Sequence, residues 1–275
     1  MIEGKDNEDG VKKVDWPIIV MMAVGMVLII VALLMLVFAM LSYRRADNTY
    51  NDLRDTYVLL EDPDEEKKNG DDKEEPIEDD TWWYRNVYID LAGLQSVNSD
   101  VVGWIRFDNI GILNYPILYS GDDVAYLYKD IYGRDSNSGC IFLEGENTPD
   151  FNDSHTIIYG HNMKNGSMFG LLKNYNTEGF YEENRFFTIY ADGIAYRYEI
   201  FAYEEVDADD EIYTIGYVPG QEFAEFLDML RRKSYIAPDI IVKDTDKIVT
   251  LSTCTTTDRR FVVHGVCFAA HSYGR

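Results

Sequence analysis

Cysteine and histidine are scarce in this chain of 275 residues, which contains three cysteines and four histidines. An odd and small number of cysteines is not the framework of a disulfide-stabilised fold. A pairing of Cys140 with Cys267 is disfavoured as well, because both lie in apolar, strand-like runs where buried cysteine is common. The cysteine and histidine spacings contain no CxxC or HExxH pattern, which disfavours a zinc site.

Basic residues are also in short supply, with 25 Lys and Arg against 49 Asp and Glu, for a formal net charge of −24. A nucleic acid backbone attracts the opposite sign of charge, so this class of partner is not expected. The negative charge is uneven. Residues 61–80 contain 12 acidic and 3 basic residues, and such a run is typical of a solvated, self-repelling and disordered segment.

Charge is missing altogether from residues 16–43, which are apolar along their whole length. At about 1.5 Å per residue, a helix of this length crosses a hydrocarbon core of roughly 30 Å. The run is longer than the apolar part of a secretory signal and shows no small-x-small cleavage site, which favours an uncleaved anchor. Two basic residues on each side leave the positive-inside rule undecided. The short amino-terminal segment makes an N-inside, C-outside topology the simpler choice.

The composition predicts four parts: a cytoplasmic tail (1–15), a transmembrane anchor (16–43), an acidic stalk or linker (44–80) and a folded domain (81–275). Helical spacing of apolar residues indicates two short helices around the acidic run. One has Tyr50, Leu53, Tyr57 and Leu60 on a face, and the other has Tyr84, Val87, Leu91 and Leu94.

Beyond residue 100 the pattern changes to short runs rich in β-branched and aromatic residues, separated by turns. These strand-like runs are "VVGWIRF", "LNYPILY", "GCIFLE", "HTIIYG", "FFTIYA", "AYRYEIFAY", "DIIVK", "KIVTLSTC" and "RFVVHGVCFAA". So many short strands favour a mostly β domain, either a barrel or a sandwich. One late helix interrupts them, with an apolar stripe at Phe223, Phe226, Leu227 and Leu230.

Three residues in these runs are candidates for nucleophilic chemistry. Cys254 ends the strand "KIVTLSTC", Arg260 follows six positions later, and His161 opens a polar loop after "TIIYG". A free thiol has a pKa of about 8.5, so a nucleophilic cysteine needs a base or a cationic neighbour. Taken singly, a lone strand cysteine or a lone histidine is more often a buried structural residue.

The remaining polar features are weaker candidates. His155 precedes a strand and is expected to face solvent, whereas His264 shares the strand alternation of Arg260 and is a second candidate base. The acidic run at residues 203–211 contains several carboxylates that could bind calcium. It lacks the EF-hand spacing, so a solvated loop is the better interpretation.

The motifs in their order resemble those of the sortases, and within them class B. The residues that carry the likeness are "TLSTC" (250–254), "RFVV" (260–263), "YGHNM" (159–163) and "GSMFG" (166–170). The resemblance implies a closed eight-stranded β-barrel with peripheral helices, following a single membrane-spanning helix. It also implies a cysteine transpeptidase, held on the outer face of a Gram-positive-type cell membrane, that needs no cofactor or metal. Such enzymes cut a sorting motif of a secreted protein, often of the form Asn-Pro-x-Thr, and join it to an amine of peptidoglycan or its lipid-linked precursor.

The same resemblance assigns roles to residues of this chain. Cys254 is then the nucleophile, His161 the proton-transfer group and Arg260 the donor to the oxyanion. Ser252 and Leu127 match positions that contact the sorting peptide. The segment between Cys254 and the motif's arginine is short, so the adjacent Arg259 is an alternative donor to the oxyanion. Arg260 is preferred because it directly precedes "FVV".

Other functions remain as alternatives. A class C-like, pilin-polymerising sortase is disfavoured, since no lid motif or second membrane span is evident. A non-catalytic module that binds sorting peptides is disfavoured by the presence of all three candidate residues. A papain-like protease is disfavoured because the histidine precedes a cysteine that lies in a strand. The acidic run at 204–211 predicts a negative groove edge, and hence a preference for lysine near the sorting motif.

Overall fold

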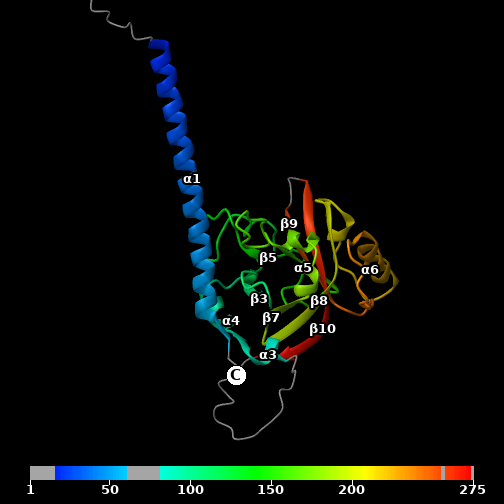
Figure 1. Cartoon of the computed structure of the whole chain (residues 1–275). Helices are drawn as coiled ribbons and strands as arrows, with labels where there is room; N and C mark the ends of the chain where they lie inside the picture. The colour runs from blue at the N-terminus through cyan, green and yellow to red at the C-terminus, as the bar shows by residue number, and fades with distance from the viewer. Residues whose placement is uncertain (1–15, 61–80, 255–257, 274–275) are drawn as a thin grey trace, which may run out of the picture. The chain divides into compact units, whose positions relative to one another are not determined.

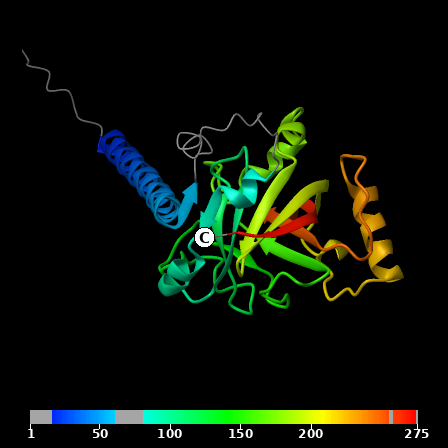
Figure 2. The same cartoon turned by 90° about the horizontal axis from the view of Figure 1, so that it is seen from below.

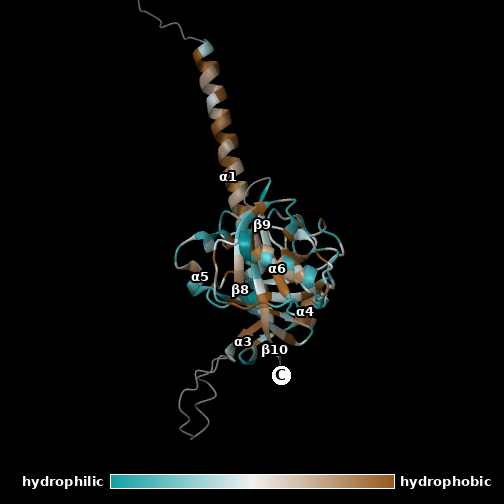
Figure 3. Ribbon diagram, turned by 90° about the vertical axis from the view of Figure 1, so that its right-hand side faces the viewer, coloured by the Kyte–Doolittle hydropathy of each residue, from teal (hydrophilic) through white to brown (hydrophobic). Residues whose placement is uncertain are grey.

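The structure is a computed structural model that describes residues 16–60, 81–254 and 258–273 (Figure 1). The chain divides into two compact units, one ending at Arg44 and the other running from Arg45 to Arg275. The first unit contains the apolar part of helix α1 (Trp16–Tyr57), coloured brown in Figure 3. Among the described residues, α1 is the one helix that is long and apolar enough to cross a membrane.

The second unit consists mainly of strands. Its strands are β1 (Val58–Leu60), β2 (Val87–Ile89), β3 (Val101–Phe107), β4 (Asn114–Leu118), β5 (Ile141–Leu143), β6 (His155–Tyr159), β7 (Phe186–Ala191), β8 (Ile194–Asp207), β9 (Ile248–Cys254) and β10 (Arg259–Ser272). The helices after α1 are short, namely α3 (Trp82–Arg85), α4 (Leu91–Val97), η1 (Leu172–Asn176), α5 (Phe180–Glu183), η2 (Glu211–Tyr213) and α6 (Gln221–Lys233).

Strands β3 to β10 form a closed barrel in the order β10-β8-β7-β3-β4-β5-β6-β9, with β9 pairing back onto β10. Most neighbours are antiparallel, whereas β4 and β5 are parallel, as are β6 and β9. Large apolar side chains fill the core, among them Trp104, Tyr115, Phe107 and Phe187. The predicted mostly β, eight-stranded closed barrel is therefore confirmed.

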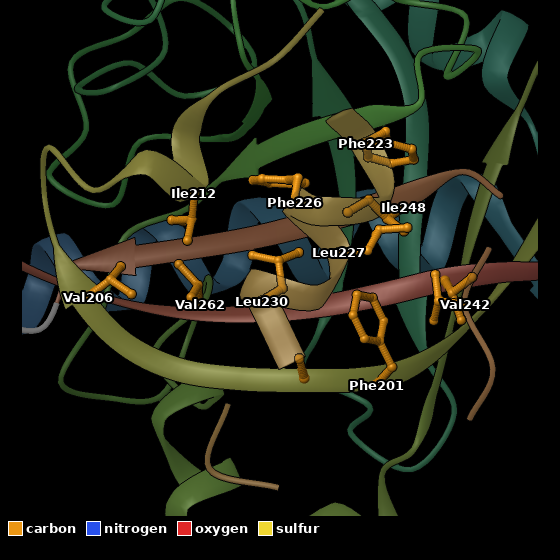
Figure 4. Close-up of a cluster of buried hydrophobic side chains, with 12 residues drawn as sticks. Phe201, Val206, Ile212, Phe223, Phe226, Leu227, Leu230, Val242, Ile248 and Val262 are labelled. Carbon is orange, nitrogen blue, oxygen red and sulfur yellow. The ribbon is translucent and has the colours of Figure 1, made fainter. Parts of the chain in front are cut away.

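Helix α6 covers part of the barrel wall and lies to one side of it in Figure 2. Its predicted apolar stripe is confirmed, because Phe223, Phe226, Leu227 and Leu230 are all buried. They pack with residues of β8, β9 and β10 in one hydrophobic cluster, whose members include Phe201, Val206, Ile248 and Val262 (Figure 4). Burial of these side chains stabilises the helix against the barrel.

The strand predicted at residues 239–243 is wrong. This segment has no regular strand pairing, and Ile241 is 78% exposed while Val242 joins the cluster under α6. The reason lies in the barrel. Both edges of β9 are already paired, with β6 and with β10, so a closed sheet offers no edge to a further strand.

The helix predicted over residues 84–94 is broken in the middle. Helix α3 ends at Arg85, and the chain then enters β2, which pairs antiparallel with β1. Val87 and Ile89 alternate inward and are buried, so the strand period prevails over the helical spacing. Helix α4 then begins at Leu91, and its N-cap residue Asp90 accepts a side-chain hydrogen bond from the Gly93 amide.

Residues 45–60 also differ from the expected stalk. They fold with the barrel, since α1 continues to Tyr57 and buries Tyr50 and Leu53. Leu60 does not share their face, because it lies in β1 and is exposed. The acidic run at residues 61–80 lies outside the described residues.

Candidate active site

The ends of three strands meet at one end of the barrel. Strands β6 and β9 are parallel, and their last paired residues are Tyr159 and Ser252. The Gly160 amide donates a hydrogen bond of 3.1 Å to the Ser252 carbonyl. His161 and Cys254 each lie two residues beyond this last pair, so the register places them at the same level of the barrel. On the other side of β9, Cys254 lies opposite Arg260 of β10.

A pocket opens at this end of the barrel. Four predicted site residues line it together: His161, Arg260, Ser252 and Leu127. The rest of its lining comprises Asp123, Phe142, Tyr159, Gly160 and Thr253. The structure describes the backbone of Cys254, which lies at the end of β9. The same strand contributes Ser252 and Thr253 to the pocket lining. The structure thus brings the predicted residues from four separate segments to one place.

His161 is held by a backbone carbonyl. Its Nε2 lies 2.6 Å from the Leu127 carbonyl oxygen, and its ring is 5.7 Å from that of Tyr128. A carbonyl oxygen can only accept, so Nε2 carries the hydrogen in this contact. In the neutral ring, Nδ1 is then the nitrogen available to accept a proton.

The two adjacent arginines have different surroundings. Arg260 is partly buried and lines the pocket, and its guanidinium also donates to the Arg259 carbonyl at 3.1 Å. Arg259 lies outside the pocket lining and instead forms an ion pair of 2.7 Å with Asp207 of β8, plus a hydrogen bond to the Glu205 carbonyl. An arginine that is engaged in this way is less available to a substrate oxygen.

Tyr159 and Asp123 line the pocket, and further tyrosine and carboxylate side chains contact its lining residues. The Ser252 hydroxyl lies 2.9 Å from that of Tyr213, and Tyr159 donates a hydrogen bond of 2.8 Å to Glu144. Burial, together with the nearby Asp123 carboxylate, raises the pKa of Glu144 above its ordinary value. None of these tyrosines or carboxylates was singled out from the sequence, because their roles depend on neighbours from distant strands.

Two other histidines of the barrel strands, His155 and His264, do not line this pocket. His155 was expected to face solvent, but it is fully buried, with Nδ1 at 2.8 Å from the Thr214 carbonyl and Nε2 at 2.7 Å from the Thr250 hydroxyl. Burial lowers the pKa of His155 to about 3. His264, the second candidate base, is also fully buried and contacts Thr250 and Glu204 at 2.8 and 3.2 Å. Both histidines therefore belong to a buried polar chain that links β6, β9, β10 and β8.

The acidic run at 203–211 is not a simple solvated loop. Strand β8 extends through it to Asp207, and Glu204 is buried against His264. Asp207 pairs with Arg259, and Asp210 forms an ion pair of 2.6 Å with Lys233. Several of the expected free charges are thus paired, and the lysine preference inferred from them stays a prediction. Among the described residues, no cluster of His, Cys, Asp or Glu is arranged to hold a metal ion.

Comparison with known proteins adds evidence from other chains. Residues 105–267 match the family model of the sortase domain. The chain belongs to the sortase family. It is 37% identical over 168 residues to sortase B of Listeria monocytogenes, which covers 61% of this chain and 68% of that protein.

Solved sortases share the fold of this sortase. Sortase B from B. anthracis superposes with a TM-score of 0.68 at 27% identity, covering 84% of this chain and all of that one. A Staphylococcus aureus sortase B–substrate complex superposes with a TM-score of 0.61 at 29% identity, covering 66% of this chain and 85% of that one. The predicted class B resemblance is confirmed, and the protein is a cysteine transpeptidase of the sortase B type. As in other sortases, its substrates are sorting signals.

Proposed function

We propose that this sortase uses Cys254, His161 and Arg260 to cleave a sorting motif of the Asn-Pro-x-Thr kind and to transfer the cleaved protein to a cell-wall amine. The observation that carries the proposal is the β6–β9–β10 register. In this register Cys254 is level with His161 and opposite Arg260. His161 and Arg260 both line the adjacent pocket.

The first half of the reaction forms a thioester. With its proton transferred to His161, the Cys254 sulfur attacks the carbonyl carbon of the motif's threonine, and the carbonyl oxygen takes up the electron pair. Arg260 donates hydrogen bonds to this oxyanion and remains a cation throughout. The peptide C–N bond then breaks, and the departing amine receives a proton from His161.

The second half reverses these roles. An incoming amine of peptidoglycan or its lipid-linked precursor attacks the thioester carbonyl and loses a proton to His161. The thiolate of Cys254 leaves, and a new amide bond replaces the one that was broken. The Nε2–carbonyl contact of His161 supports Nδ1 as the nitrogen for both proton transfers, since a nitrogen that already donates to a carbonyl is engaged.

Two further residues are proposed as substrate contacts. Leu127 and Ser252 both line the pocket. The Ser252 hydroxyl is oriented by Tyr213, so it can present either its hydrogen or a lone pair to the peptide backbone. Leu127 offers an apolar side chain while its carbonyl binds His161.

The sharpest test uses the full chain in detergent with quenched fluorescent peptides carrying Asn-Pro-x-Thr, Ser-Pro-x-Thr or Leu-Pro-x-Thr. We expect cleavage after the threonine and an acyl adduct on Cys254 in the mass spectrum. Cleavage is lost in Cys254→Ala, and it falls about a hundred- to a thousandfold in Arg260→Ala. Arg259→Ala is the matched control and retains activity. Peptide binding without cleavage would instead support a non-catalytic module. Loss of cleavage in Arg259→Ala but not in Arg260→Ala would make Arg259 the donor to the oxyanion.

We also propose that residues 16–43 anchor the enzyme in the cell membrane, with the amino terminus inside and residues 45–275 outside. The apolar helix supports this role by its length and composition. Protease added to intact cells is expected to digest the catalytic domain while sparing a tag at residue 1. Protection of the domain in intact cells, or its recovery in the soluble fraction, would contradict the topology.

A further inference from the structure

The carboxyl-terminal part of α1 contacts the barrel beside the active site. Tyr50 is 3% exposed, and its hydroxyl donates a hydrogen bond of 2.7 Å to the Gly139 carbonyl. The same hydroxyl lies 3.5 Å from the Cys140 sulfur. This helix segment belongs to the same compact unit as the barrel, so the contact is part of the catalytic domain's own packing.

Gly139 in turn packs against the group that holds His161. A Cβ atom at Gly139 would lie 2.5 Å from the Leu127 carbonyl oxygen and 3.1 Å from Cδ2 of His161. The residue has a φ of +55°, a conformation that glycine adopts without steric cost. The backbone of Gly139 is therefore one wall of the niche in which the His161 imidazole meets its carbonyl partner.

Cys140 completes the link to the segment of Leu127. Its amide donates to the Tyr126 carbonyl at 3.0 Å, and its thiol donates to the Lys129 carbonyl at 3.1 Å. Burial raises the pKa of Cys140 to about 12, so the thiol keeps its hydrogen and remains a donor. A continuous series of contacts thus runs from Tyr50 through residues 139 and 140 to the carbonyl that binds His161.

We propose that Tyr50 is a positioning residue for catalysis, which fixes His161 through the 139–140 turn and the Leu127 carbonyl. The competent catalytic domain accordingly includes residues 45–57 of α1 and is larger than the segment from residue 81 onward. This inference rests on the proposed role of His161 in proton transfer. An acid–base group displaced by about 1 Å can lose a hundredfold in rate, so a partial loosening of its niche reduces turnover measurably.

Another contact of the same helix segment provides a matched control. Arg54 lies one turn further along α1, and its guanidinium donates to the carbonyls of Ile112 and Asn114 at 3.4 and 3.3 Å. These bonds also dock α1 onto the barrel, but they reach neither Gly139 nor Leu127. Arg54 also lies over the Tyr115 ring at 5.6 Å, and Tyr50 contacts that ring at 5.1 Å. We expect a change at Arg54 to weaken the docking of the helix while the hydrogen bond from Tyr50 to Gly139 is kept.

The test compares the full-length wild type with Tyr50→Phe and Arg54→Gln in detergent. Each protein is assayed for peptide cleavage from pH 5 to pH 9 and for its thermal midpoint. We expect Tyr50→Phe to lower kcat about tenfold with little change in KM, and to shift the pH dependence of kcat. Arg54→Gln lowers the thermal midpoint while keeping the kcat and the pH profile of the wild type. A Tyr50→Phe enzyme with wild-type kcat and pH profile, or an equal kcat loss in Arg54→Gln, would overturn the proposal.

A second readout does not depend on activity. Histidine labelled with ¹⁵N reports the tautomer and titration of His161, whose signals are identified by their loss in His161→Gln. In the wild type we expect the Nε2–H tautomer, and in Tyr50→Phe a mixture of tautomers or a displaced titration. Unchanged His161 signals in Tyr50→Phe would refute the positioning role, even if the wild type failed to cleave any peptide. Absence of cleavage by the wild type would instead count against the proposed function.

Discussion

The imidazole of His161 and the backbone carbonyl of Leu127 lie 2.6 Å apart, between Nε2 and O. Leu127 also lines the pocket, so it contributes its carbonyl to the site and, as proposed above, its side chain to substrate binding. The backbone contact persists in any substitution that preserves the local fold, whereas the side-chain contact does not.

Leu127→Ala separates these two contributions. We expect KM for the sorting peptide to rise about tenfold, because an apolar contact of this size is worth 1–2 kcal/mol, with kcat within twofold of the wild type. Steady-state cleavage kinetics measure both values. Val124→Ala, a change at an exposed neighbour, serves as the control and leaves both unchanged. A selective fall in kcat would show that the side chain itself helps to position His161.

Gly139→Ala probes the niche of His161 from its other wall. The added methyl group meets backbone oxygens at 2.5 and 2.7 Å, so the Leu127 carbonyl has to move and we expect kcat to fall at least tenfold. Gly133→Ala is the control, because it has a similar φ of +73° but no atom within 4 Å of the added Cβ. Both variants lose about 1 kcal/mol of stability to backbone strain. Equal kcat values in the two variants would argue against the niche.

Glu144→Gln tests the partly buried carboxyl group that accepts a hydrogen bond from the pocket residue Tyr159. Because the folded state raises the pKa of Glu144, it binds a proton more tightly than the unfolded chain does. The contribution of this group to the stability of the folded state is thus fully present below its ordinary pKa. It is lost as the pH rises through the pKa that the group has in the folded state. We expect Glu144→Gln to raise the thermal midpoint relative to wild type at pH 7 but not at pH 4. The control Glu146→Gln, at an exposed residue, should show no such pH-dependent difference. A higher thermal midpoint of Glu144→Gln at pH 4 but not at pH 7 would mean that folding lowers the pKa of Glu144 instead of raising it.

Thr250→Val tests the buried polar chain beneath the site. The Thr250 hydroxyl contacts His155 Nε2 at 2.7 Å and His264 Nδ1 at 2.8 Å. Its removal therefore leaves two buried nitrogens without this hydrogen-bond partner. We expect a loss of about 3 kcal/mol in the free energy of unfolding, measured by urea denaturation. Thr250→Ser keeps the hydroxyl and should lose less than half as much. Similar losses in both variants would mean that the methyl group, and not the hydrogen bonds, stabilises this position.

The sequence was a good guide wherever a local pattern coincides with burial. The α6 stripe and most barrel strands follow from apolar periodicity, and the motif order places His161, Arg260, Ser252 and Leu127 around one pocket. The expected strand at 239–243 failed because strand propensity does not reveal that both edges of β9 are occupied. Glu204 looked solvated because its partner His264 lies 60 residues away along the chain. Tyr50 was read as part of a stalk for the same reason, since its partner Gly139 is also distant in sequence.

The parallel pairing of β6 with β9 has a consequence for when the enzyme becomes active. The strands that place His161 and Cys254 are far apart in the sequence, and a contact of this kind forms only after a long loop has closed. A chain that is still emerging from the ribosome or crossing the membrane therefore has no assembled site until β9 and β10 have joined the sheet. Because β10, which carries Arg260, follows the other described strands of the barrel in the sequence, the site is inactive until this strand has been synthesised and the barrel has closed.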